Sequence, residues 1–83
     1  MPFVTYILKS EVARKTYVGH TQDKEKRLKQ HNRGQNIYAK RFKPWTMIYF
    51  EEFLTREDAF KREKYFKSAA GRRWMKKNLF DNQ

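Results

Sequence analysis

The spacing of apolar and polar residues predicts a β-hairpin at the start of the chain. Residues 3–9 (FVTYILK) are rich in β-branched and aromatic side chains, and residues 16–20 (TYVGH) are a second run of this kind. Between them, residues 10–15 are polar and typical of a turn. We therefore expect two neighbouring antiparallel strands.

Alternation along these strands predicts which side chains share a face. Val4, Tyr6 and Leu8 fall on one face of the first strand. Tyr17 and Gly19 share one face of the second. Because Gly19 has no side chain, it leaves space for another group to approach closely.

The middle of the chain predicts a helix, a loop and a third strand. Asp23 is a good N-cap for a helix that reaches about Asn32, and Gly34 can end it. Residues 33–43 are basic and are expected to be mostly irregular. Residues 45–53 (WTMIYFEEF) follow a proline and are typical of a strand.

The last third of the chain predicts two helices. Thr55 is expected to start the first, which runs through about Ser68. Gly71 is expected to separate it from a short basic helix, about residues 72–79, anchored by Trp74.

The resulting order, β-β-α-β-α-α, predicts an α+β fold with a three-stranded, mainly antiparallel sheet flanked by helices. A length of 83 residues indicates a single domain over 1–83. The absence of cysteine excludes disulfides and thiolate metal sites. No apolar run is long enough for a membrane span and no signal peptide is visible, so we expect a soluble cytoplasmic protein without a membrane partner.

Charge points to a polyanionic partner. Twenty Lys and Arg oppose nine Asp and Glu, a formal net charge of +11. Basic residues interleaved with aromatic ones suit phosphate contact and base stacking. The alternatives are a merely soluble basic surface, a ribosomal or membrane-surface partner, or, for the aromatic residues, packing in the core or a loop. The predicted nucleic-acid contacts are His20, Lys24, Arg33, Tyr38, Lys40, Arg41 and Lys43.

One carboxylate stands out because of its place on the predicted helix after Thr55. At about 100° per residue, Glu63 falls within the apolar stripe that contains Ala59 and Phe66. A carboxylate there faces a desolvation cost unless it is paired or bound to a metal. It either forms an ion pair with Lys67 or Arg62, or has a functional role.

These residues supply the parts that phosphodiester hydrolysis needs. An arginine offsets phosphate charge, a general base accepts the proton of water, and a divalent cation polarises the phosphate. With one candidate carboxylate, a single Mg²⁺ completed by water and phosphate fits better than a two-metal site.

Four segments together resemble the GIY-YIG nuclease domain, especially its small stand-alone bacterial members. They are TYIL (5–8), TYVG (16–19), EKRLKQHN (25–32) and REDAFKREKYFK (56–67), in the family's order over nearly the whole chain. The resemblance implies a sheet-centred fold and a single-metal phosphodiesterase site with Mg²⁺ or Mn²⁺.

Carried over by position, the resemblance assigns a role to five residues. Tyr17 helps to activate the attacking water and Tyr6 is its hydrogen-bonding companion. Arg27 binds phosphate, His31 assists the base, and Glu63 is the metal ligand. The alternatives are ordinary strand aromatics for the tyrosines, a solvated charge for the arginine, and a helix-dipole contact for the histidine.

The chain departs from the family pattern at three places. The GI of the first motif is Val4 and Thr5 here. His20 replaces a lysine that some members carry directly after the second motif. Met75 stands where several members have an asparagine, for which Asn78 is a loose substitute.

The sequence therefore predicts a metal-dependent DNA endonuclease. Because the chain is too short for a separate recognition module, we expect it to select a structure such as a branch, flap or nick, or to be targeted by a protein partner. The alternatives are a non-catalytic nucleic-acid-binding module on the same fold and a module that binds an acidic protein.

Overall fold

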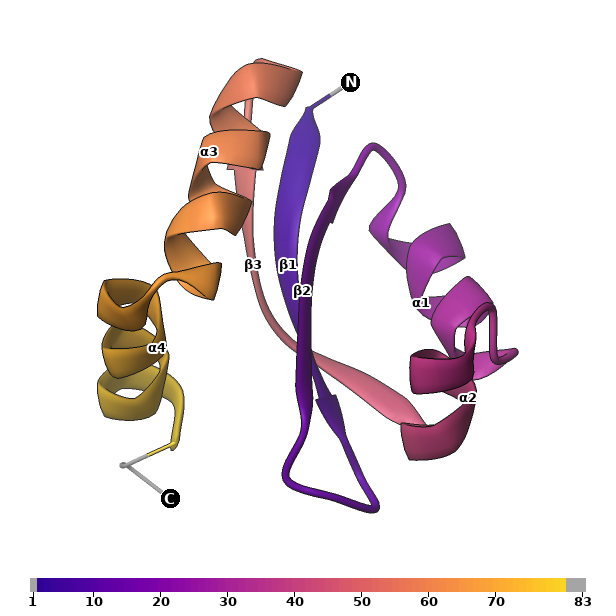
Figure 1. The fold of residues 1–83 in the computed structure, drawn as a ribbon. Coiled ribbons are helices and arrows are strands. Elements are labelled where there is room, and N and C mark those ends of the chain that lie inside the picture. Colours follow the sequence, from indigo (N-terminus) through magenta and orange to yellow (C-terminus); the bar gives the residue numbers. More distant parts are fainter. Residues whose placement is uncertain (1, 81–83) are drawn as a thin grey trace.

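A three-stranded antiparallel sheet forms the centre of the molecule in the computed structural model, which describes residues 2–80 (Figure 1). Its strands are β1 (Phe3–Ser10), β2 (Thr16–Thr21) and β3 (Trp45–Phe53) in the order β2-β1-β3. The predicted strands and their antiparallel pairing are confirmed. Residues 1 and 81–83, the ends of the expected domain, lie outside the described residues.

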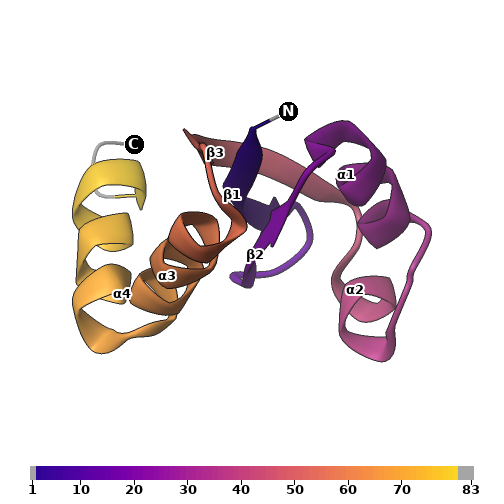
Figure 2. The ribbon, with the colours of Figure 1, turned by 90° about the horizontal axis from the view of Figure 1, so that it is seen from above.

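Helices cover both faces of the sheet, so the fold has three layers (Figure 2). One face carries α1 (Lys24–Asn32) and α2 (Ile37–Phe42). The other carries α3 (Arg56–Lys67) and α4 (Ala69–Met75), which the π-helical turn η1 (Lys76–Phe80) continues. No helix in the described part of the chain is long and apolar enough to cross a membrane.

Alternation along the central strand divides the core into two clusters. Val4, Tyr6 and Leu8 pack with Trp45 on the side of α1 and α2, as predicted for one face of β1. Ile7 faces the other way and packs with residues of α3 and α4. Both faces of β1 are therefore buried, which explains its nearly continuous apolar run.

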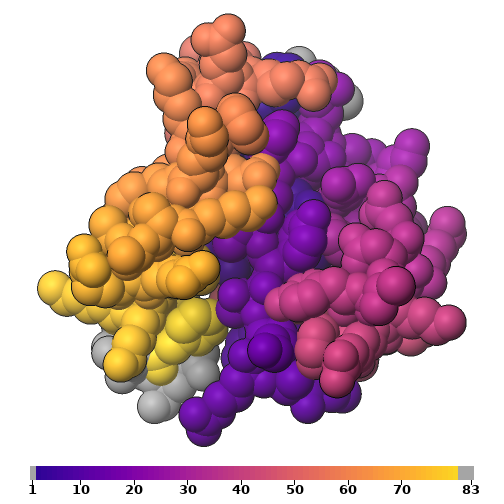
Figure 3. Space-filling view, in the orientation of Figure 1, coloured from indigo at the N-terminus to yellow at the C-terminus, as the bar shows by residue number. Residues whose placement is uncertain are grey.

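The strand β2 lies at an edge of the sheet, because among the described strands it pairs with β1 alone. Figure 3 shows this strand at the bottom of a depression between the layer of α1 and α2 and the layer of α3 and α4. The free backbone edge of β2 is thus accessible between two walls of side chains.

The prediction of a mostly irregular segment over 33–43 was wrong in part, since this segment contains α2. The backbone N–H of Ala39 donates to the side-chain oxygen of Asn36 at 2.8 Å, which caps the helix. Ala39 is buried, and its carbonyl accepts from the indole N–H of Trp45 at 3.0 Å. A six-residue helix is too short to show a periodic apolar stripe, so tertiary contacts decide its structure.

The predicted break at Gly71 was also wrong, because α3 ends at Ser68 and Gly71 lies within α4. Ser68 ends one helix and caps the next by accepting from the backbone N–H of Gly71 at 3.2 Å. A Cβ at position 71 would lie 1.9 Å from the carbonyl oxygen of Tyr65. The glycine therefore allows the close approach of α4 to the end of α3.

We expect Gly71→Ala to lower the free energy of unfolding by about 1–3 kcal/mol, because the added methyl must push the two helices apart. Chemical denaturation measures the change. The matched control is Ala70→Ser in the same helix, which is exposed and should shift stability by less than about 0.5 kcal/mol. Equal stability of the two variants would show that the junction can relax without cost.

Candidate active site

Four of the five predicted catalytic residues lie together on the α1 side of the sheet. The arginine Nε of Arg27 donates to the phenol oxygen of Tyr6 at 3.2 Å. The same phenol lies 3.3 Å from Nε2 of His31. The rings of Tyr17 and His31 have centroids 4.3 Å apart, and those of Tyr6 and Tyr17 stack at 6.4 Å. We call these four residues the tyrosine cluster.

The close approach expected at Gly19 is made by Tyr6. The two residues are cross-strand partners, and a Cβ on Gly19 would lie 2.6 Å from the phenol oxygen of Tyr6. A side chain at position 19 would displace the phenol from Arg27 and His31. Gly19 therefore makes room for the tyrosine cluster.

Tyr6 is protonated at neutral pH. Burial raises the pKa of Tyr6 to about 12, although the hydrogen bond from Arg27 opposes this effect. A phenol with this pKa is a hydrogen-bond donor rather than a general base. This argues against Tyr6 for any role in accepting a proton.

His31 is a core residue as well as a candidate catalytic one. It is 1 % exposed, and together with Leu28, which packs against the core, it holds α1 to the sheet. Its Nδ1 is buried and has no hydrogen-bond partner within residues 2–80. Burial lowers the pKa of His31, and the positive charge of Arg27 lowers it further. The imidazole is thus neutral at neutral pH.

We expect stability to fall as the pH drops below about 6.5, the ordinary pKa of histidine. The pKa of His31 is lower in the folded than in the unfolded state, so acid favours the unfolded chain, and the loss of stability grows as the pH falls below this value. Urea denaturation of the wild type and of His31→Gln over this range measures the effect. The variant should lose this part of the pH dependence, and parallel curves would contradict the assignment.

The fifth predicted residue, Glu63, belongs to a second group of charged side chains. Its Oε1 lies 2.5 Å from Nδ1 of His20, and its Oε2 accepts from Nζ of Lys67 at 2.7 Å. The side chain of Glu63 is 13 % exposed, so it faces inward as the helical spacing predicted. Of the two ion pairs considered, Lys67 forms one, whereas Arg62 pairs with Glu51. We call Glu63, His20 and Lys67 the carboxylate cluster.

Glu63 is ionised at neutral pH. Burial alone would raise its pKa, but the hydrogen bonds from His20 and Lys67 outweigh burial and lower the pKa. The negative charge of Glu63 also contributes to the raised pKa of Tyr6, after burial as the main cause. The two clusters are therefore close enough to interact electrostatically.

The edge strand β2 connects the two clusters. Tyr17 and Gly19 point to the α1 side, and the alternate residues Val18 and His20 point to the α3 side. Since β2 is at the edge, groups from both faces can reach one ligand that lies along it. This explains how residues from opposite faces can form one site.

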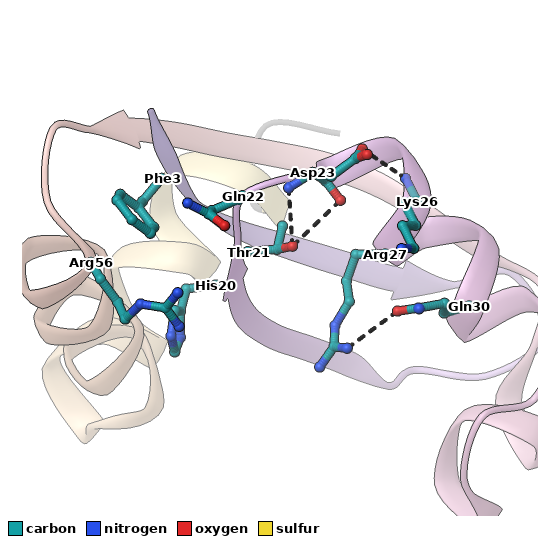
Figure 4. Close-up of a pocket in the computed structure, with 9 residues that line it drawn as sticks. All are labelled: Phe3, His20, Thr21, Gln22, Asp23, Lys26, Arg27, Gln30 and Arg56. Atoms are coloured by element: carbon teal, nitrogen blue, oxygen red, sulfur yellow. Dashed lines mark hydrogen bonds between the residues drawn. The ribbon is translucent and has the colours of Figure 1, made fainter. Parts of the chain in front are cut away.

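Two pockets lie along β2, one toward each end of the strand. The first has a volume of about 470 Å³ and is lined by Phe3, His20, Lys26, Arg27 and Arg56 among others (Figure 4). We call it the Phe3 pocket. The second, the Tyr38 pocket, has a volume of about 330 Å³, and its lining includes Tyr17, Tyr38, Lys67 and Arg72. Each pocket is lined by residues of both the tyrosine cluster and the carboxylate cluster. Together the two pockets form a groove along β2 that passes the candidate site.

The structure places two of the seven predicted nucleic-acid contacts in this groove. His20 lines the Phe3 pocket and Tyr38 lines the Tyr38 pocket. Tyr38 also stacks on Trp45, which is buried, and donates its hydroxyl to the carbonyl of Thr16. The other five residues do not line either pocket and remain predicted contacts of the α1–α2 layer: Lys24, Arg33, Lys40, Arg41 and Lys43.

Sequence reasoning missed four cations that do line the groove, namely Lys26, Arg56, Lys67 and Arg72. Lys26 precedes the predicted Arg27 and lies one helical turn before Gln30, another lining residue. This helical spacing places Lys26 and Gln30 on one face of α1, so the sequence could have indicated Lys26 as a lining residue. For Arg56 and Arg72 no local signal exists, because their place depends on how α3 and α4 pack against the sheet.

Within the carboxylate cluster, Glu63 is the residue that offers an oxygen ligand to a hard divalent cation. Within residues 2–80 no group of three His, Asp or Glu side chains could hold a metal ion. The ionised Glu63 offers an oxygen ligand, and Mg²⁺ commonly takes one carboxylate with water and phosphate as its other ligands. The ammonium of Lys67 occupies Oε2, but its side chain is 55 % exposed and can move into solvent.

The possible substitute for the missing asparagine lies elsewhere. The side-chain amide of Asn78 donates to the backbone carbonyl of Trp74 at 2.8 Å, which gives a hydrogen-bond partner to a carbonyl near the end of α4. Met75 is buried in the core under α4. Neither residue takes part in the tyrosine or carboxylate cluster.

Comparison with known proteins identifies the family of the chain. A family model described as the GIY-YIG catalytic domain matches residues 2–78, nearly all of the described chain. The chain belongs to the GIY-YIG family. The family model is that of a nuclease domain, and Tyr6 and Tyr17 stay the predicted tyrosines of its two name-giving motifs.

Similar GIY-YIG relatives include small bacterial proteins. The UPF0213 protein YazA of Bacillus subtilis is 42% identical over 52 residues, which cover 61% of this chain and 52% of that protein. A UPF0213 protein of Staphylococcus saprophyticus is 38% identical over 61 residues, covering 72% of this chain and 74% of that one. The chain thus spans about half the length of the first relative and nearly three quarters of the second.

A solved structure supports the fold. The NMR structure of the UPF0213 protein BH0048 from Bacillus halodurans superimposes with a TM-score of 0.56 at 24% identity, covering 98% of this chain and 88% of that one. At this identity the likeness bears on the fold alone.

Proposed function

We propose that this GIY-YIG protein is an endonuclease that hydrolyses phosphodiester bonds in DNA with one divalent cation, Mg²⁺ or Mn²⁺, held by Glu63. The observation that carries the proposal is the position of an ionised, inward-facing carboxylate across the β2 edge from an arginine that is hydrogen-bonded to a buried tyrosine. The groove along β2 is lined by cations, which suits a polyanionic substrate.

The side chains divide the work of hydrolysis. The guanidinium of Arg27 lines the Phe3 pocket and would bind non-bridging phosphate oxygens, with Tyr6 holding its orientation. Tyr17 lines the Tyr38 pocket and, as the phenolate, would accept the proton of the attacking water, with neutral His31 packed against its ring. A cation bound at Glu63 would polarise the scissile phosphate.

The second candidate is a non-catalytic nucleic-acid-binding module on the same fold. It needs the cationic groove but not a buried carboxylate. The contact of Glu63 with His20 favours the nuclease, because His20 lines the Phe3 pocket together with Arg27 and so brings a carboxylate near the proposed phosphate-binding arginine.

Cleavage of labelled DNA tests the proposal. Branched, flapped, nicked and single-stranded substrates are incubated with the protein in Mg²⁺, Mn²⁺ or EDTA, and products are separated by length. We expect cleavage with either metal, none in EDTA, and a preference for one of the structured substrates. Binding without cleavage on every substrate and with both metals would favour the non-catalytic module.

We expect Lys67→Met to bind Mn²⁺ about threefold to tenfold more tightly than the wild type, because the ammonium on Oε2 of Glu63 is removed. Electron paramagnetic resonance of free Mn²⁺ gives the affinity directly, without any cleavage assay. The matched control is Lys64→Met, on the same helix, whose ammonium lies over the ring of Phe60 instead. If both variants bind Mn²⁺ equally, Lys67 does not compete with the cation.

A further inference from the structure

The Phe3 pocket is larger than the binding of one phosphate by Arg27 requires. It forms where the start of β1, the end of β2 and the first turns of α1 and α3 meet (Figure 4). It shares His20 and Arg27 with the candidate active site. Its volume of about 470 Å³ extends beyond them to residues that the proposed reaction does not use.

The charges in the Phe3 pocket favour an anion. Lys26, Arg27 and Arg56 line it, against Asp23 as the one acidic residue of its described lining. Asp23 is already engaged, since its carboxylate accepts from the backbone N–H of Lys26 at 3.0 Å and caps α1. Lys26 and Arg56 are both exposed and belong to helices on opposite sides of the pocket.

The pocket also offers flat and polar surfaces that a phosphate alone would not need. The guanidinium of Arg56 lies over the ring of Phe3, 5.3 Å from its centroid. Aromatic rings and arginine planes are the surfaces on which nucleic-acid bases stack. Gln30 accepts from Arg27 at 3.3 Å through its side-chain oxygen, which leaves its amide N–H groups to donate.

We propose that the Phe3 pocket binds a nucleotide of the substrate strand that adjoins the cleaved bond, with Lys26 and Arg56 on its phosphate and the Phe3–Arg56 pair against its base. The proposal rests on the proposed function for its position: a phosphate on Arg27 has its neighbouring nucleotide in the pocket that Arg27 lines. It assigns a binding role to Phe3, Lys26 and Arg56, to which the resemblance gives no role.

Binding of DNA in EDTA, where no metal-dependent cleavage occurs, tests the pocket. Fluorescence anisotropy with a labelled thymidine oligonucleotide compares Lys26→Gln/Arg56→Gln with Lys29→Gln/Lys61→Gln. The second pair removes two exposed charges from the same two helices but does not line the pocket. We expect at least about tenfold weaker binding by the pocket variant and a salt slope smaller by about 1.4, that is, two contacts of about 0.7 each.

Titration of thymidine 3′,5′-bisphosphate into ¹⁵N-labelled protein locates the ligand. The backbone amides of Thr21, Gln22 and Gln30, which line the pocket, should shift in the wild type and stay unchanged in the pocket variant. Spectral dispersion of both double variants confirms that they are folded.

The outcomes separate this proposal from the nuclease. Equal affinity and salt slope for the two double variants, or amide shifts confined to the Tyr38 pocket, would overturn the nucleotide subsite while DNA cleavage could stand. The converse result is also possible to distinguish. If the wild type binds the oligonucleotide and the bisphosphate but never cuts DNA, and the pocket variant loses this binding, the nuclease is overturned and the subsite is supported.

Discussion

Replacing Glu63 with glutamine is expected to lower the rate of DNA cleavage by on the order of 10³-fold while leaving DNA affinity nearly unchanged. The substitution keeps the size of the side chain and its capacity to contact His20 and Lys67. It removes the negative charge that a hard cation requires. Single-turnover cleavage in Mg²⁺ and anisotropy binding in EDTA measure the two effects separately.

The matched control is Glu51→Gln. Glu51 is also a partly buried, ion-paired carboxylate, held by Arg62 at 2.7 Å and by the hydroxyl of Tyr49. It lies on β3, away from the β2 groove. This control should lose about 1–3 kcal/mol of stability and keep the cleavage rate. Equal trace activity in the wild type and Glu63→Gln would indicate a contaminating nuclease and would remove the basis for the enzyme.

The local parts of the fold were predictable because each has its own pattern. Alternation grouped Tyr6 with Val4 and Leu8 on one face of β1, and Tyr17 with Gly19 on one face of β2. The structure adds that these two faces are the same side of the sheet, where Tyr6 pairs with Gly19. The helical spacing of Ala59, Glu63 and Phe66 identified a carboxylate that faces inward. These inferences depend on a period of two or of about 3.6 residues, which a single sequence shows directly.

The groove could not be predicted, because it depends on how distant segments pack. Nothing local to β2 shows that it is an edge strand, or that His20 leaves it on the side of α3 and meets Glu63. The predicted basic surface was therefore centred on residues 24–43, where charge is dense in sequence. The structure brings Arg56 and Arg72 to the groove instead, from the third and fourth helices.

Arg27→Gln is expected to lower the turnover number by roughly 10²–10³-fold and to change DNA affinity far less. Other cations of the groove can bind the substrate backbone. Arg27 differs from them because the buried phenol of Tyr6 orients its guanidinium. Arg27→Lys should recover only part of the rate, because an ammonium keeps the charge but loses the planar fork and the Nε–H to Tyr6.

The matched control for Arg27→Gln is Lys29→Gln, with turnover and DNA affinity measured in the same way. Lys29 is an exposed cation on the same helix, but it does not line the groove. Full recovery by Arg27→Lys would show that charge alone matters and that the hydrogen bond to Tyr6 has a structural role. Unchanged turnover in Arg27→Gln would remove this residue from the site. A loss confined to turnover would instead place Arg27 on the reacting phosphate, where charge develops in the transition state and where orientation by Tyr6 has its effect.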